Sequence, residues 1–146
     1  MPRWRWGLDA DAETNRQSTQ DWTMLGATWA IVYGMSLIVQ DSSIWAASTY
    51  DTAKILPCSP TSWGVILTLG GLFMFIGMFF GKSLFMTSGA MICALWNLFF
   101  GISLGKAFLH DGLSFSPLST YFALMGAYIV CFLTYRRRNA IRRSSS

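Results

Sequence analysis

Long apolar runs separated by short polar segments dominate the chain of 146 residues. Such runs occupy residues 22–40, 63–80, 83–104 and 118–135, and none of them contains Asp, Glu, Lys, Arg or His. Each run has close to the roughly 20 residues with which a helix crosses a bilayer. Helices are expected because lipid cannot satisfy an open backbone. The pattern therefore predicts an all-α, polytopic integral membrane protein with an antiparallel bundle of four transmembrane helices.

The polar segments define the rest of the organisation. We expect an N-terminal tail at residues 1–21, a transmembrane domain at 22–135 and a basic tail at 136–146 that ends in disordered serines. Spans two and three are joined by little more than Gly81-Lys82, so they should form a tight hairpin. The longest loop, 41–62, can begin a short helix capped by Ser42 or Ser43, and 106–117 is predicted to be a loop. The long acidic lead before span one favours a retained span over a cleaved signal peptide.

Basic residues set the expected orientation. Nine Lys and Arg residues fall on the side of the two tails and the hairpin, against two, Lys54 and Lys106, in the other loops. Basic residues beside spans stay in the cytoplasm, so both termini are predicted to be cytoplasmic. Aromatic residues near the span ends, Trp22, Trp63 and Tyr121 among them, are placed as an interfacial belt would place them.

The composition also indicates that most of the chain lies in the hydrocarbon of a membrane. The chain is 53% hydrophobic and only 12% charged, whereas soluble domains average about 25% charged residues.

Small residues recur at spacings of three, four and seven in every span, which places each set on one helix face. Close backbone approach is what holds helices together in lipid, so we expect these faces to point inward. The candidate packing residues are Gly26, Ala30 and Gly34 in span one, Gly70, Gly77 and Gly81 in and after span two, Ala90, Ala94, Asn97, Gly101 and Gly105 in and after span three, and Ser119, Ala123 and Ala127 in span four, where Cys131 extends the set.

Asn97 is the one amide within spans two to four. It shares a face with the small residues of its span, so it should point into the bundle and bond a neighbour such as Ser119, Thr68 or Tyr128. Such a bond contributes on the order of 1 kcal/mol. The alternative is that Asn97 lines a path for water or ions, which a single uncharged amide supports less well.

Residues for catalysis or cofactor binding are not apparent. Proton-coupled transporters keep ionisable groups within their spans, and this chain has none there. We interpret His110 and Asp111 as a solvated pair in a loop, because a metal site needs more ligands. Cys58, Cys93 and Cys131 have no metal-binding spacing and do not indicate a redox compartment. We therefore expect no enzyme activity, no catalytic residues, no cofactor and no metal.

The basic tail is predicted to anchor the topology and to hold anionic lipid head groups, at about 1 kcal/mol per basic residue. Nucleic acid is not an expected partner, because so short a basic run beside a span is typical of a topology anchor. The anchoring residues are Arg136, Arg137, Arg138, Arg142 and Arg143.

The run "WGVILTLGGLFMFIG", the basic hairpin and "ALWNLFFGISL" together resemble small four-span membrane proteins of bacteriophages, some of them holin-like. The resemblance implies a role in the host inner membrane, by clustering into lesions through small or aromatic faces. Two alternatives remain open: a non-enzymatic accessory or scaffold subunit that binds a membrane partner, and a small channel or carrier. A homo-oligomer fits the first reading and a membrane-protein partner fits the second.

Overall fold

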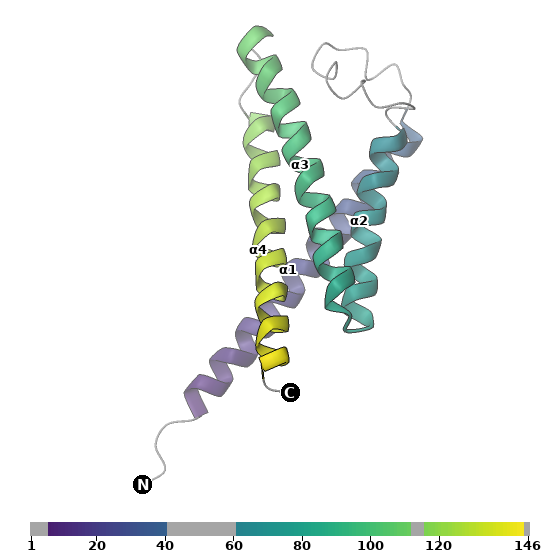
Figure 1. Cartoon of the computed structure of the whole chain (residues 1–146). Helices are drawn as coiled ribbons and strands as arrows, with labels where there is room; N and C mark the ends of the chain where they lie inside the picture. Colours follow the sequence, from purple (N-terminus) through teal and green to yellow (C-terminus); the bar gives the residue numbers. More distant parts are fainter. Residues whose placement is uncertain (1–5, 41–60, 112–115, 145–146) are drawn as a thin grey trace.

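The computed structural model is all-helical wherever it describes the chain, which is residues 6–40, 61–111 and 116–144. Its helices are α1 (Trp6–Val39), α2 (Thr61–Phe79), α3 (Ser83–Asp111) and α4 (Ser116–Ser144) (Figure 1). Three stretches are long and apolar enough to cross a membrane: Gln17–Val39, Thr61–Phe79 and Ser83–Lys106. The helical, membrane-type character expected from the apolar runs is therefore confirmed.

Three helices extend beyond the predicted spans. α1 begins at Trp6, inside the predicted tail, and α4 continues through the arginines to Ser144, where disorder was expected. α3 continues to Asp111 and α4 begins at Ser116, so the prediction of a loop at 106–117 is wrong for residues 106–111 and 116–117. Once a span has formed, each further residue adds a hydrogen bond without a new nucleus, so the helix runs past the apolar boundary. The short helix considered after Ser42 or Ser43 lies outside the described residues. The last two residues of the predicted loop 41–62, Thr61 and Ser62, belong to α2.

Each helix packs along the next one in the chain, and α1 meets α4 at only a few positions (Figure 1). The tight hairpin between α2 and α3 is present. Gly81 forms its turn with a φ of 60°, a left-handed conformation that glycine adopts without steric cost. The first turn of α1 and the last turn of α4 lie at the same end of the molecule as this hairpin.

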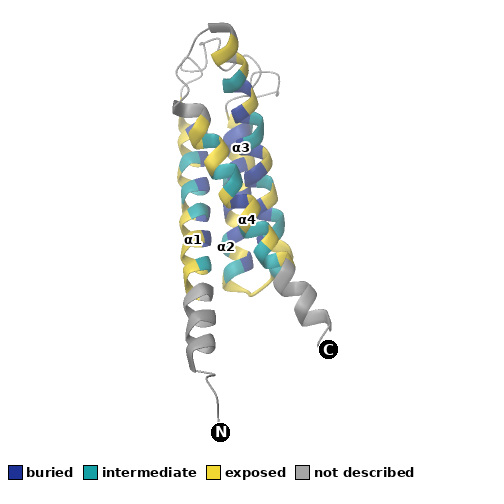
Figure 2. Ribbon diagram, turned by 90° about the vertical axis from the view of Figure 1, so that its left-hand side faces the viewer, coloured by how far each residue is buried: buried dark blue, intermediate teal, exposed yellow. Residues whose placement is uncertain are grey.

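Buried residues line the contacts between the helices, and exposed residues face outward (Figure 2). Many of the exposed residues have large apolar side chains. Leu25, Val32, Leu95 and Val130 are each more than half exposed. An apolar surface this extensive is rare on soluble monomers, and hydrocarbon is the solvent that suits it.

Candidate functional site

The backbones of α1 and α2 touch at a pair of glycines. A Cβ placed on Gly64 would lie 2.5 Å from the carbonyl oxygen of Gly34, and one on Gly71 would lie 2.8 Å from that of Ala27. No larger residue fits at these positions unless the helices separate. The sequence identified Gly34 but missed Gly64 and Gly71, although their spacing of seven places them on one face.

A neighbouring face of α2 meets α3 in the same way. A Cβ on Gly77 would lie 2.5 Å from the backbone nitrogen of Met86, and one on Gly70 would lie 2.8 Å from Cys93 Sγ. Gly89, which the sequence analysis missed, comes equally close to the carbonyl of Gly70. α2 therefore carries two glycine faces, one for each neighbour. Ala30, Ala90 and Ala94 are also buried in these contacts, as predicted.

The small face of α4 does not pack within the chain, and the prediction is wrong there. Ser119, Ala123 and Ala127 are all exposed. α4 instead contacts its neighbours through large rings: the buried Tyr128 lies against Gly26 of α1, and the partly exposed Phe122 lies against Gly101 of α3. A glycine leaves room for a large side chain of the neighbouring helix as well as for its backbone. The spacing of small residues alone does not show which of the two will be there.

Of two further packing candidates, Gly81 contradicts the prediction and Gly105 does not. Gly81 is exposed in the turn, where a Cβ would meet nothing within 4 Å. Gly105 is half-buried near the end of the third candidate span.

Side-chain hydrogen bonds join α1 and α4 along their line of contact. The hydroxyl of Tyr128 donates to the carbonyl of Gly26 at 2.8 Å. The hydroxyls of Tyr33 and Tyr121 lie 3.0 Å apart, and Thr23 Oγ1 lies 3.6 Å from Cys131 Sγ. The three pairs follow a single antiparallel register. We call this line the α1–α4 seam.

An aromatic cluster ties the four helices together at the end where α2 begins. The indole Nε1 of Trp96 donates to the carbonyl of Trp63 at 3.0 Å, and its ring stacks on Phe100 with centroids 4.1 Å apart. Tyr33 meets Trp96 edge to face, and Tyr121 stacks on Phe100. Trp63 is therefore a buried core residue and not part of an interfacial belt, whereas Trp22 is 67% exposed.

Asn97 points into the protein, as predicted, and its side chain is fully buried. The expected bond to another helix is not formed. Its Nδ2 donates to the carbonyl of Cys93 in its own helix at 2.8 Å, and its Oδ1 has no hydrogen-bond partner. Thr68 Oγ1, one of the expected partners, is likewise buried without a partner.

The described residues contain no group of three or more His, Cys, Asp or Glu that could hold a metal ion. Cys93 and Cys131 are free thiols; Cys58 and the side chains of His110 and Asp111 lie outside the described part. Among the anchoring arginines, Arg136 is exposed, with its guanidinium 6.0 Å from the Phe132 ring centre. Arg137, Arg138, Arg142 and Arg143 are helical, and their side chains are not described.

Comparison of the chain with models of protein families, with curated proteins and with solved structures gives no match.

Proposed function

We propose that the chain is a four-span protein of a bacterial inner membrane that acts without catalysis, as a holin-like permeabilising protein. The observation that carries the membrane part of the proposal is the set of three apolar helices long enough to span. No charged residue lies between Thr61 and Phe80 or between Ser83 and Gly105.

Two observations support α4 as the fourth span. Residues 118–135 are uncharged, and α4 lies along α3, which is itself a candidate span. The first turn of α1, the last turn of α4 and the α2–α3 hairpin share one end (Figure 1). Lys82 of the hairpin and the arginines in the last turns of α4 belong to that end, which supports cytoplasmic termini.

A topology reporter that is active only outside the cytoplasm tests this arrangement. Fused after Ser146 it should be inactive, and inserted in the loop between Asp41 and Pro60 it should be active. Activity after Ser146 would contradict the even number of crossings and, with it, the role of the arginines as a cytoplasmic anchor.

The holin-like role is supported by the resemblance in layout and by the strongly apolar outer surface of the helices, which suits accumulation in lipid. Its test is induced expression in a bacterium with a dye that reports membrane potential. An abrupt loss of potential at a fixed time after induction is expected. Steady growth at high expression would contradict the role.

The accessory or scaffold role is the second candidate. The exposed small residues of α4 favour it, because such a face allows a helix of another membrane protein to approach closely. Steady growth together with a stoichiometric co-purifying membrane protein is the result expected from this role. The channel alternative has less support, because Asn97 is enclosed and its amide is bonded to its own helix.

A further inference from the structure

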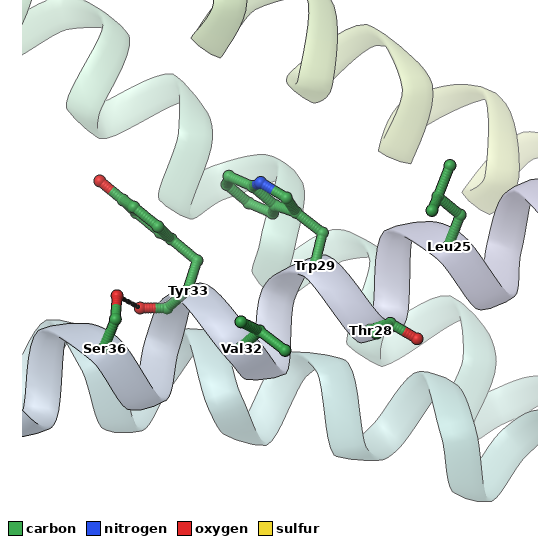
Figure 3. Close-up of a pocket in the computed structure, with 6 residues that line it drawn as sticks. All are labelled: Leu25, Thr28, Trp29, Val32, Tyr33 and Ser36. Atoms are coloured by element: carbon green, nitrogen blue, oxygen red, sulfur yellow. Dashed lines mark hydrogen bonds between the residues drawn. The ribbon is translucent and has the colours of Figure 1, made fainter.

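A groove of about 360 Å³ runs along α1, beside the seam with α4. It is mainly apolar, and every residue that lines it belongs to α1, at spacings of three and four: Leu25, Thr28, Trp29, Val32, Tyr33 and Ser36 (Figure 3). This spacing is that of a helix face which receives another helix. The hydroxyl of Ser36 is turned back onto the carbonyl of Tyr33 at 2.7 Å, so the groove presents little free polarity.

The groove lies within the candidate span Gln17–Val39, so its occupant must be apolar and must lie in the bilayer. From Leu25 to Ser36 it extends over 12 residues, which is about 16 Å of helix from the first to the last. A neighbouring transmembrane helix has this length and shape. Because the groove is bordered by large side chains, a helix with small residues can approach it most closely.

This chain itself carries such a helix face. Ser119, Ala123 and Ala127 of α4 are exposed and four residues apart, on the side of α4 opposite the buried Tyr128. Within one molecule α1 and α4 are antiparallel. A second copy inserted in the same orientation offers its α4 to the groove in the same antiparallel sense.

Charge complementarity favours a second copy over other helices. The first turns of α1 carry Asp9, Asp11 and Glu13, and the last turns of α4 carry Arg142 and Arg143. Both segments are helical and leave the membrane domain at the same end (Figure 1). When α4 of one copy lies against α1 of another in this antiparallel sense, the acidic turns and the basic turns lie at the same end, where opposite charges attract over a Debye length of about 8–10 Å.

We infer that the α1 groove is a self-association surface that receives the small-residue face of α4 from a second copy, with the acidic turns of α1 beside the basic turns of α4. In a dimer with a two-fold axis along the membrane normal, this contact forms twice, because each copy offers both its α1 groove and its α4 face. The inference rests on the proposed four-span topology with both ends of the chain on one side.

A charge-swap experiment tests the contact. One variant carries Asp9→Lys, Asp11→Lys and Glu13→Lys, and the other carries Arg142→Glu and Arg143→Glu, which leaves Arg136 to Arg138 as the topology anchor. Energy transfer between donor- and acceptor-labelled copies is measured in phosphatidylcholine vesicles. Each variant alone should associate about tenfold more weakly than the unchanged chain, because like charges then face each other.

A mixture of the two variants should recover association, since both contacts between them are attractive. Failure of the mixture to recover would overturn the inference, because charge pairing within one copy cannot be restored by mixing. The measurement is repeated in vesicles that also contain phosphatidylglycerol. If association changes with this anionic lipid and not with mixing of the variants, the arginines bind anionic lipid instead and the inference is again overturned. The topology reporter distinguishes either result from a failure of the four-span arrangement.

Filling the contact provides an uncharged test. Ala123→Phe should reduce energy transfer about tenfold, since a ring at this position prevents close approach. Leu69→Phe on the exposed side of α2 is the matched control and should leave transfer unchanged. Equal transfer for both variants would contradict the proposed surface.

Discussion

The hydroxyls of Tyr33 on α1 and Tyr121 on α4 lie 3.0 Å apart, and both rings belong to the aromatic cluster around Trp96. This hydrogen bond connects helices that are far apart in the chain and share few other contacts. The α1–α4 seam therefore depends on specific side-chain bonds, while the contacts of α2 with α1 and with α3 depend on glycines.

The tyrosine pair should show measurable coupling. Tyr33→Phe and Tyr121→Phe should each lower the free energy of unfolding in detergent, and the double variant should lose less than the sum. The coupling expected is about 0.6 kcal/mol, the usual size for side-chain hydrogen bonds between spans. A strictly additive double-mutant cycle would show that the two hydroxyls do not interact.

The glycine contact of α1 with α2 should tolerate no side chain. Gly64→Ala should destabilise the protein by about 1–3 kcal/mol, because the new methyl group meets the backbone of α1 and the helices must shift. Gly126→Ala on α4 is the matched control, since its Cβ would meet nothing within 4 Å. Denaturation in sodium dodecyl sulfate, followed by circular dichroism, measures both, and equal stability of the two variants would contradict this packing.

Trp96 should be a major contributor to stability. Trp96→Phe removes the hydrogen bond to the carbonyl of Trp63 and leaves space within the aromatic cluster. We expect a loss of about 2–4 kcal/mol in the free energy of unfolding, from a lost bond and a partly filled cavity. Trp22→Phe, at an exposed position, should change stability by less than about 0.5 kcal/mol.

The sequence-based prediction and the structure lead to different expected stabilities for Asn97→Leu. A bond to another helix would make the substitution destabilising by about 1 kcal/mol. The structure shows a buried Oδ1 without a partner, and replacing such a group by an apolar one of similar shape is neutral or stabilising. We therefore expect unchanged or higher thermal stability in detergent, and a clear loss would show that Oδ1 has found a donor.

The sequence was sufficient to predict the features that depend on whether a segment lies in lipid or in water. Uncharged runs revealed the helices, although three of them continue into the polar segments, and the Gly81-Lys82 pair revealed the hairpin. The sequence was insufficient to predict which residue of a neighbouring helix each side chain contacts. Small residues at Gly34 and Gly70 face backbone, yet the equally regular set at Ser119, Ala123 and Ala127 faces outward. Asn97 was placed correctly inside, but its partner was not, because an amide can bond its own helix one turn back.

The two glycine faces of α2 also bear on how the chain assembles. Both are used by helices adjacent to α2 in the sequence, so these contacts can form as each hairpin leaves the ribosome. Contacts between close neighbours cost little chain entropy and form fast. The meeting of α1 with α4 is the long-range step and must wait for the last helix to be synthesised. A ribosome that stalls before α4 would therefore leave a three-helix intermediate already packed around α2.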